Sequence, residues 1–585
     1  MRNSLVLLLA LVATGACKKK STENKGSASG ASGASAGTAG GGSPTGDGTK
    51  SATTEAGGPL QQVNECPPAL KDTDKGLRRT IPAGCTTTVQ GDYYVEGELI
   101  IEAGATLKFA ADSALYVGYT DASKLIVNGS KDKPVTFASG GDQAPGTWKG
   151  VHLYSRAARS QVTGLVIEYA LIGLESEAPE LSVKDSLIRG TRDVGIKISD
   201  EGTLAAFAGN TFDKPGALAM TVPPAAMVGF GAGNVFPADA LVELRAGNVS
   251  TSGTWSHPGA PIKVTGEVYI DGKAGKATIE VAAGNQFRID TSGAIYVGYT
   301  GDAELKVAGT KDAPVTFVAA GDPEPGAWER GIISYARGTL TLDHAVISHG
   351  GADGRGAVRA EGGKLSITSS TIKDNVVGIS VDDQGDLRGF DQNQLAGNRD
   401  HALVVFPRHL GALGAANTYD AQKLLVHGGR VDKAATWAIQ PGATVIIDGE
   451  LYVEGGALTL PAGSTYAFTD NAGVYVGYSG DGTLVVQGTA DKPVTLESTR
   501  HETGGWKGVE LYGRTVASSL QHLVVKDAAG GGVRVSGGGV VKIEGLTCSA
   551  CEKAALTWDC QSKVTQSAVK GDAGTPKGAL APEGC

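Results

Sequence analysis

The sequence predicts an all-β fold, a parallel β-helix in which coils of three short strands stack on one another. The segment Tyr-Val-Gly-Tyr-Thr at 116–120 returns at 296–300 and, with Ser as its last residue, at 475–479. Spacings of 180 and then 179 residues mark a repeat architecture, in which neighbouring units bury each other's apolar faces. Gly accounts for 87 of 585 residues, about twice its usual share of roughly 7%, which suits many tight turns.

The N-terminus is typical of a bacterial export signal, with Arg2 ahead of the apolar segment 5–12. Because Cys17 follows small residues, the segment resembles a lipoprotein signal, although Thr14 stands where Leu is usual. We expect residues 1–16 to be a lipoprotein signal peptide and Cys17 to be lipidated, which would attach the protein to a membrane. An ordinary signal peptide followed by an unmodified Cys is the alternative.

Residues 17–62 comprise the lipidated Cys and a linker rich in Gly, Ser and Ala, which has almost nothing to bury. We expect this linker to be a disordered tether. Position 18 is Lys, not the Asp linked with inner-membrane retention, so we expect attachment at the outer membrane or the cell surface. No run of about 20 apolar residues follows, so the sequence predicts no transmembrane helix.

Short strands are visible in the segment that follows. Three-residue alternations at 99–101, 107–109, 115–117 and 125–127 place two apolar residues on one side and a third residue on the other. Turn residues such as those at 103–105 separate these strands. Three strands with their turns occupy about 26 residues, from Leu99 to Leu125, so each coil is expected to have three sides.

The order of motifs resembles a group of exported bacterial right-handed parallel β-helix repeat proteins. The likeness rests on residues 97–109, on Pro-Val-Thr-Phe at 134–137 and on Gly-Thr-Trp-Lys-Gly-Val at 146–151, and it continues through 365–372 and 377–379. It covers about 90 to 560 and implies the fold; most members of this group lack an assigned reaction.

These patterns predict a division into one cap, three units and a second cap. We expect units of about 180 residues, the spacing of the motif. The last unit is expected to be truncated, because the third copy is shorter than the others. The predicted boundaries are an N-terminal cap at 63–90, units at 91–260, 261–443 and 444–556, and a Cys-containing C-terminal cap at 557–585.

An even set of six further Cys residues in an exported chain suggests disulfides at the two ends. The six are Cys66, Cys85, Cys548, Cys551, Cys560 and Cys585. A bridge from Cys66 to Cys85 is expected, and the pairing of the last four stays open. The alternative is a metal site at Cys548 and Cys551, which have zinc-ligand spacing but lack a second such pair or a nearby His.

Aromatic side chains recur once in every unit and are the candidate binding residues. With near-integral coils per unit, three Trp-bearing loops would line one side of the solenoid as a binding ridge. Flat aromatic faces there could stack on sugar rings. The alternative is that the Trp side chains fold back over the turns and the Tyr side chains stack on neighbouring coils. The residues concerned are Trp148, Trp328, Trp506, Tyr116, Tyr296 and Tyr475.

Catalysis would use residues that occur once. Asp343, His344 and His349 form a local trio at the ends of predicted strands, and Asp382 with Asp383 is a carboxylate pair of the kind that hydrolases need. Adjacent carboxylates on a strand point to opposite faces, and the other motifs of polygalacturonases are absent from the sequence. We therefore expect both groups to be polar turn residues, with a catalytic role as the alternative.

The net charge of −9 gives no basic face for nucleic acid. No cofactor motif is present, and a weak Ca²⁺ site at Asp121, Asp302 or Asp481 is a lesser alternative to solvated turns. The sequence thus favours a non-catalytic envelope scaffold that binds a polysaccharide or a surface protein. A polysaccharide lyase or glycoside hydrolase is the second hypothesis.

Overall fold

The structure, a computed structural model, describes residues 60–352, 354–419, 424–439, 443–571 and 580–583. The predicted signal peptide, nearly all of the predicted linker, Cys17 and Cys585 lie outside the described residues. Within the described part of the chain, no helix is both long enough and apolar enough to cross a membrane.

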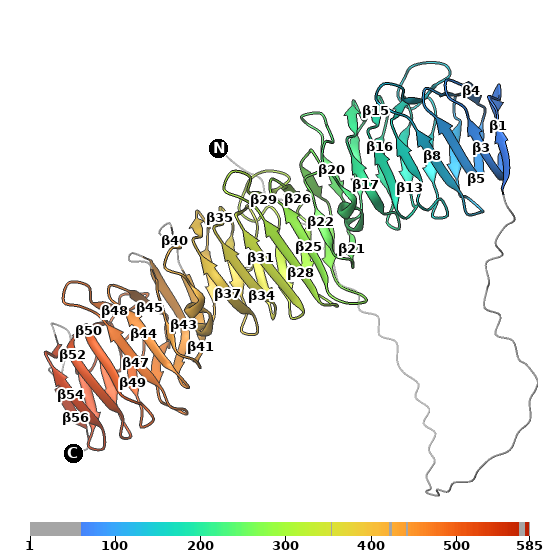
Figure 1. Cartoon of the computed structure of the whole chain (residues 1–585). Helices are drawn as coiled ribbons and strands as arrows, with labels where there is room; N and C mark the ends of the chain where they lie inside the picture. The colour runs from blue at the N-terminus through green and yellow to red at the C-terminus, as the bar shows by residue number, and fades with distance from the viewer. Residues whose placement is uncertain (1–59, 353, 420–423, 440–442, 572–579, 584–585) are drawn as a thin grey trace, which may run out of the picture. The chain divides into compact units, whose positions relative to one another are not determined.

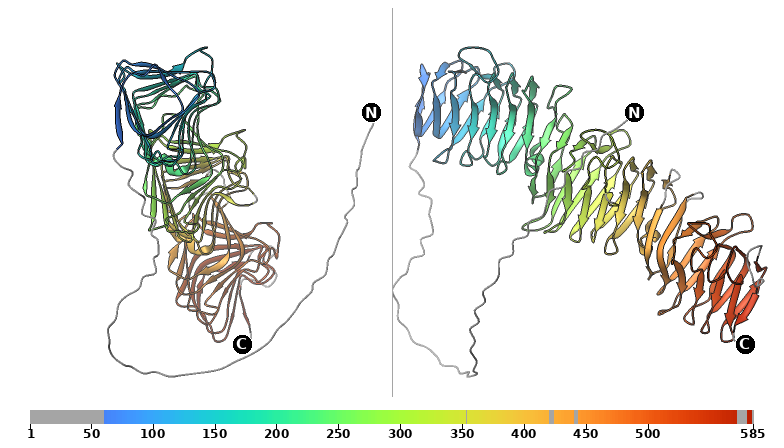
Figure 2. Two further views of the ribbon diagram at one scale, coloured as in Figure 1. Left: turned by 90° about the vertical axis from the view of Figure 1, so that its right-hand side faces the viewer. Right: turned by 180° about the vertical axis from the view of Figure 1, so that it is seen from behind.

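The chain forms an all-β solenoid of about 20 coils. Its strands run parallel to their neighbours in the coils before and after, as Figures 1 and 2 show. One coil contains β7 (Ala114–Val117), β8 (Lys124–Asn128) and β9 (Val135–Ser139), separated by turns. The three strands pair with β10 (Gly150–Leu153), β11 (Gln161–Thr163) and β12 (Leu165–Glu168) of the next coil. The three-sided coil predicted from the sequence is thus present.

Alternation along each strand builds the core. In β7, Leu115 and Val117 are fully buried, whereas Tyr116 between them points away from the core and is half-buried. The same period of two holds in β8, where Leu125 and Val127 are buried. Stacking coils therefore joins the inward side chains into one continuous apolar cluster that spans the solenoid.

Strands that pair with one another from coil to coil form a ladder along the solenoid. We call the ladder that contains Tyr116 the Tyr116 ladder. Its strands are β7, β10, β13 (Ile172–Ser176), β16 (Val194–Ile198), β19 (Leu218–Val222), β20 (Val242–Leu244), β23 (Ile262–Val264) and β26 (Gln286–Ile289). Seven pairings lead from β7 to β26. Tyr296 lies on the next strand along the chain, β27 (Ala294–Val297), and so one side further round the coil.

The same shift occurs a second time. The Tyr296 ladder contains β27, β30 (Ile332–Tyr335), β33 (Gly356–Glu361), β36 (Val377–Val381), β39 (His401–Val405), β41 (Leu424–Val431), β43 (Thr444–Val453) and β45 (Thr465–Phe468). Tyr475 lies on β46 (Gly473–Val476), the strand after β45. Each recurrence of the motif therefore comes after seven coils and one further side.

A short 3-10 helix precedes each of these shifts. The helix η1 (Pro224–Gly229) packs beside β17 (Leu204–Ala208), and η2 (Pro407–Ala412) packs beside β37 (Asp386–Asp391). Both begin with a Pro at the first helical position, where its missing N–H leaves no bond unmade.

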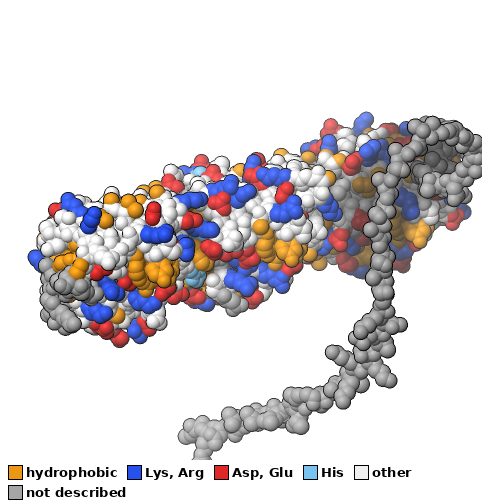
Figure 3. Space-filling model, turned by 90° about the horizontal axis from the view of Figure 1, so that it is seen from below, with side chains coloured by type: hydrophobic (Ala, Val, Ile, Leu, Met, Phe, Trp, Pro, Cys, Tyr) orange, Lys and Arg blue, Asp and Glu red, His pale blue; other side chains and the backbone are white. Residues whose placement is uncertain are grey.

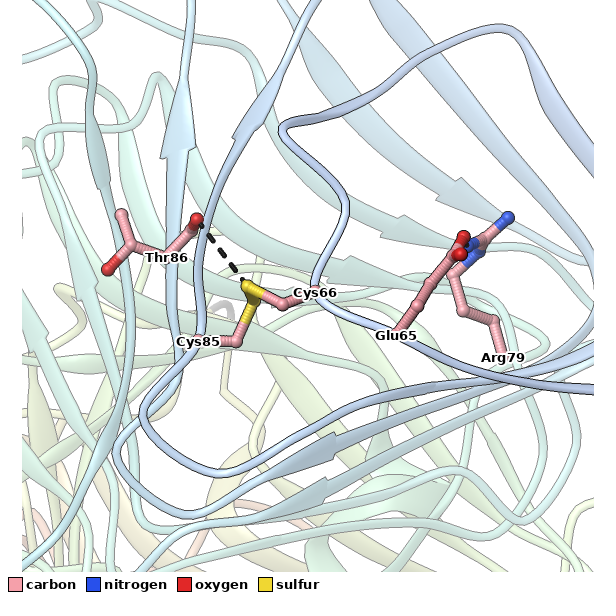
Figure 4. Close-up of a disulfide and its surroundings, with 5 residues drawn as sticks. All are labelled: Glu65, Cys66, Arg79, Cys85 and Thr86. Atoms are coloured by element: carbon pink, nitrogen blue, oxygen red, sulfur yellow. Dashed lines mark hydrogen bonds and ion pairs between the residues drawn. A yellow bond between two sulfur atoms is a disulfide. The ribbon is translucent and has the colours of Figure 1, made fainter.

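The N-terminal end is closed by a disulfide between Cys66 and Cys85, whose Cα atoms are 5.6 Å apart (Figure 4). Beside it, Arg79 bonds Glu65 at 2.7 Å and the buried Asp74 at 2.5 Å. The segment predicted as a cap already consists of coil strands, because β1 (Gln61–Asn64) pairs in parallel with β3 (Thr73–Ile81).

At the other end, Cys548 and Cys551 form a second disulfide, which uses both sulfurs of the zinc-like spacing. Cys560 is also disulfide-bonded. The strands β53 (Leu556–Asp559) and β54 (Lys563–Ser567) continue the parallel pairing there.

Candidate functional site

The predicted tryptophan ridge is wrong. Trp148 and Trp328 are fully buried and Trp506 is 1% exposed, so no ring face is available to a ligand. Each indole N–H donates to a carbonyl of the following coil: Trp148 to Glu168, Trp328 to Ser348 and Trp506 to Lys526, at 2.7–2.9 Å. The physical reason is that a large apolar ring gains by burial, and for these three indoles the backbone one coil ahead supplies an acceptor for the N–H.

The Trp residues also fail to line one side of the solenoid. Trp148 leads into β10 of the Tyr116 ladder, whereas Trp328 leads into β30 of the Tyr296 ladder. In the coil where Trp328 occurs, the strand that belongs to the Tyr116 ladder is β29 (Val315–Ala319), and β30 lies on another side. The loops that carry Trp148 and Trp328 therefore lie on different sides of the coil. A non-integral number of coils separates them, contrary to the expectation.

The three predicted Tyr residues lie on the outer face and are joined by three further Tyr residues each. We call these groups the first, second and third tyrosine clusters. The first contains Tyr94, Tyr116, Tyr119 and Tyr154; the second Tyr269, Tyr296, Tyr299 and Tyr335; the third Tyr452, Tyr475, Tyr478 and Tyr512. The residues come from three consecutive coils in each case.

The rings of each cluster contact one another across the strands. In the first cluster Tyr94 and Tyr116 stack with ring centroids 5.0 Å apart, because the two residues are direct partners on adjacent parallel strands. Tyr119 leans over this pair and lies 5.1 Å from Tyr154. Tyr119 is 54% exposed, and its counterparts Tyr299 and Tyr478 are 57% and 58% exposed. Each cluster thus presents one open ring on a bed of partly covered rings.

A glycine turn explains why the outermost ring projects. Gly118, Gly298 and Gly477 have φ values of +74°, +73° and +68°, the left-handed region that favours Gly. A Cβ at Gly298 would lie 2.2 Å from the backbone nitrogen of Gly338 in the following coil. The sequence Tyr-Val-Gly-Tyr therefore needs Gly both for its turn and for close packing, and the turn carries the second Tyr outward.

A carboxylate anchors the end of this turn in all three clusters. Glu96 accepts the backbone N–H of Thr120 at 3.0 Å and that of Asp121 at 2.8 Å. Asp271 accepts from Thr300 and Gly301, and Glu454 accepts from Ser479 at 2.7 Å. Since these acids are at most 8% exposed, the bonds hold the exposed ring in a fixed position.

An ion pair lies at the other side of each cluster. Lys149 contacts Asp92 at 2.8 Å, Lys507 contacts Glu450 at 2.6 Å, and Arg330 contacts Glu267. Glu267 also accepts the hydroxyls of Tyr269, at 2.7 Å, and of Tyr296, at 3.2 Å. Polar groups thus border the aromatic surface of each cluster.

Several phenols of the clusters have a raised pKa and so stay protonated at neutral pH. Burial raises the pKa of Tyr116, Tyr296 and Tyr475 above the ordinary value, and raises that of Tyr154 to about 12. The hydrogen bond to Glu450 raises the pKa of Tyr452 to about 12. These five rings are therefore neutral and keep their hydroxyl donors.

The predicted catalytic trio is split between two turns. His344 Nδ1 lies 3.0 Å from Asp343 Oδ1, but His349 stands at the far end of β32 (Ala345–Ser348), about 13 Å along the strand. His349 instead contacts Ser348 Oγ at 3.0 Å, and burial lowers its pKa. Both His residues have positive φ, which places them at turns.

Asp382 and Asp383 do not form a catalytic pair. Asp382 Oδ1 accepts the backbone N–H groups of Gly362 at 2.9 Å and Gly385 at 2.6 Å, so it holds a turn together. Asp383 is paired with Arg408 at 3.7 Å. The two neighbouring carboxylates therefore have different structural roles: Asp382 holds a turn, and Asp383 pairs with Arg408.

The acidic turns considered for Ca²⁺ carry other contacts. Asp121 pairs with Lys75 at 3.1 Å, and Asp302 pairs with Arg337 at 3.0 Å, which lowers the pKa of Asp302. The carbonyl of Asp481 accepts from Gly455. Among the described residues, no group of three or more His, Cys, Asp or Glu side chains could hold a metal ion.

Beside the second tyrosine cluster lies a groove of about 440 Å³. Its lining includes Arg355, Arg359, Glu361, Asp382, Phe406 and His427, from β33, β36, β39 and β41 and the turns beside them. Arg359 is 6% exposed, although it lies on the outer face of β33. All six residues occur outside the recurring motif, and among them only Asp382 gave a signal in the sequence.

Surface chemistry elsewhere is mixed. Figure 3 shows one face, on which hydrophobic side chains form separate patches between positive and negative side chains. Exposed large hydrophobic residues include Tyr119, Tyr299 and Tyr478. The second Tyr of the motif is thus the exposed one, and the turn signal of the preceding Gly could have identified it.

Comparison with protein families gives a match over residues 429–539 to a model described as a pectate-lyase like beta helix domain. The matched segment contains the whole third tyrosine cluster. Neither the curated proteins nor the solved structures yield a match. The chain is a parallel β-helix, of which residues 429–539 match the pectate-lyase-like beta helix domain.

Proposed function

We propose that this protein is a non-catalytic cell-envelope scaffold that binds glycans through its three tyrosine clusters. The observation that carries the proposal is the exposed ring of each cluster, Tyr119, Tyr299 and Tyr478, held open by a glycine turn and a buried carboxylate. A rigid ring loses little conformational entropy when a sugar ring stacks on it.

The three clusters also support a description of the chain as three copies of a unit of about 180 residues, with the last truncated. Every copy supplies four rings, one anchoring acid and one ion pair. Because each cluster lies one side further round the coil than the cluster before it, the three clusters act as separate binding sites for glycan chains. Export, the lipid anchor at Cys17 and a position at the outer membrane or cell surface belong to the same proposal and rest on the N-terminal sequence.

The test is retention on immobilised polysaccharides. The region 60–585 would be passed over a panel of neutral and acidic glycans, and Tyr119→Ala, Tyr299→Ala and Tyr478→Ala would be combined in one variant. We expect the wild type to be retained on at least one glycan and the triple variant to lose at least about tenfold in affinity, as removal of stacking contacts predicts.

The control is Val235→Ala, since Val235 is 56% exposed and lies outside the clusters. It should bind as the wild type does. Equal retention of the triple variant would contradict the tyrosine assignment. Binding to a surface protein but to none of the glycans would replace the glycan with a protein partner.

The second candidate function is a polysaccharide lyase or glycoside hydrolase, and the family match at 429–539 favours it. The same panel would be incubated with the protein, with and without Ca²⁺. Release of reducing ends or of unsaturated products would establish catalysis and overturn the scaffold proposal. Variants of Asp343, His344, His349, Asp382 and Asp383 would then be compared.

A further inference from the structure

We infer that the groove beside the second tyrosine cluster accepts an anionic substituent of a glycan, a carboxylate or a sulfate, against the guanidinium of Arg359. This inference rests on the proposed glycan binding and adds the charge of the ligand. It concerns one site of the three.

The groove continues the second tyrosine cluster along the solenoid. On the outer face of successive strands, Tyr296 is paired in register with Ile333, Ile333 with Arg359, and Arg359 with Ser380. Steps of about 4.8 Å separate these partners, so a sugar chain that stacks on the tyrosine rings reaches Arg359 within two strands.

Arg359 is a buried cation whose hydrogen bonding is incomplete. Its Nη1 lies 3.3 Å from Glu361, and its Nη2 donates to the carbonyl of Arg330. Its buried Nε has no hydrogen-bond partner among the described residues. A buried charged donor without an acceptor is costly, and a ligand oxyanion beside the guanidinium offsets its uncompensated positive charge.

The charge balance around Arg359 points the same way. Burial lowers the pKa of Arg359 even though Glu361 lies beside it, which means that the nearby negative charge does not offset desolvation of the cation. Asp382, in the turn that follows β36, uses Oδ1 to accept two backbone N–H groups. Arg355 adds a second, exposed cation to the lining of the groove.

The corresponding positions beside the other clusters are different. In the Tyr116 ladder the residue that matches Arg359 is Glu175, which pairs with Lys197 at 2.8 Å. Beside the third cluster, the exposed Arg534 pairs with Glu510 at 3.1 Å. A buried Arg with an unpaired Nε is therefore a feature of the second cluster among these three places.

The experiment measures binding of the region 60–585 to three oligosaccharides of equal length: a uronate oligomer, a sulfated oligomer and a neutral one. We expect one of the anionic oligomers to bind at least about tenfold more tightly than the neutral one, the gain expected for a charge-assisted hydrogen bond. The comparison of the two anionic oligomers identifies the substituent. Arg359→Gln should remove this preference, and Arg534→Gln, the control, should keep it.

Because Arg359 is buried, a second variant guards against loss of folding. Ser380→Asp places a carboxylate on the residue that partners Arg359 on the neighbouring strand, where it competes with a ligand anion for the guanidinium. We expect this variant to keep the thermal midpoint of the wild type and to lose the preference for the anionic oligomer.

The outcomes separate the two proposals. Equal binding of neutral and anionic oligomers by the wild type, or a preference that survives in folded Arg359→Gln and in Ser380→Asp, would overturn the anion site alone. Absence of binding to all three oligomers would overturn the proposed glycan binding as well. A preference abolished by Arg359→Gln or Ser380→Asp and kept in Arg534→Gln supports the anion site.

Discussion

The ring of Tyr475 stacks on the ring of Tyr452, with centroids 5.3 Å apart and planes inclined by 27°. Lys507 bonds Glu450, and Glu450 accepts the hydroxyl of Tyr452, so the lower ring of the stack is fixed by a charged hydrogen-bond chain. The stack forms the bed on which the exposed Tyr478 leans. The fixed positions of the covered rings of Tyr452 and Tyr475 therefore determine where the exposed ring of Tyr478 lies.

Replacement of the turn glycine tests this positioning. Gly298→Ala should destabilise the protein by about 2 kcal/mol or more, because Ala must adopt a positive φ and its Cβ would meet the nitrogen of Gly338. Thermal unfolding followed by circular dichroism measures the effect. Gly321→Ala is the matched control, since a Cβ there meets no atom within 4 Å. Equal thermal midpoints for the two variants would show that the turn tolerates a side chain.

Trp328 should matter for stability and not for binding. Trp328→Phe removes the bond from the indole to the carbonyl of Ser348 and leaves a cavity, at a cost of about 2 kcal/mol or more. Tyr478→Phe, at an exposed site, should change stability by less than about 0.5 kcal/mol. Loss of glycan retention in Trp328→Phe at an unchanged thermal midpoint would return the ridge hypothesis to consideration.

The Cys66–Cys85 disulfide should stabilise the first coils. The sequence separation is 19 residues, for which the chain-entropy model gives about 3 kcal/mol. We expect the double variant Cys66→Ser, Cys85→Ser to be cleaved by protease near the N-terminal end of the solenoid, with the later coils intact. Intact-mass measurement after thiol alkylation, with and without reduction, verifies the bond. Identical cleavage of wild type and variant would contradict a stabilising role.

His409 should make stability depend on pH. Burial lowers its pKa, while Nδ1 accepts the N–H of Phe406 and Nε2 donates to the carbonyl of Gly385, so the folded protein holds the neutral ring. The unfolded chain binds the proton more readily, and stability is complete above the ordinary His pKa of about 6.5 and falls as pH decreases towards the lower folded value. Denaturant titrations between pH 7.5 and roughly 5 measure this.

The comparison for that titration is His409→Gln, which removes the titrating ring. It should be less stable than the wild type at neutral pH and should show a shallower loss on acidification. A wild-type slope no steeper than that of His409→Gln would exclude the buried ring as its source.

The solenoid could be predicted because its signals are local. Leu115, Tyr116 and Val117 show the period of two, and the recurrence at 296 and 475 shows the period of the array. The packing of Trp148 could not be predicted, because the acceptor for its indole is the carbonyl of Glu168, one coil later. A Trp in a loop has the same sequence signal whether it is open or covered.

The candidate site was predicted in part. The outward direction of Tyr116 follows from alternation along one strand, and this was confirmed. Its neighbours Tyr94 and Tyr154 come from the coils before and after, so their meeting depends on the register between strands. Arg359 gave no signal, since its burial results from packing on the outer face that a strand pattern does not describe.

The shift of one side between recurrences decides which way the exposed rings face. Tyr119 follows β7 of the Tyr116 ladder, Tyr299 follows β27 of the Tyr296 ladder, and Tyr478 follows β46, one side further round again. A straight ligand that runs along one strand ladder therefore meets one exposed ring, and a surface that contacts all three must wrap around the solenoid.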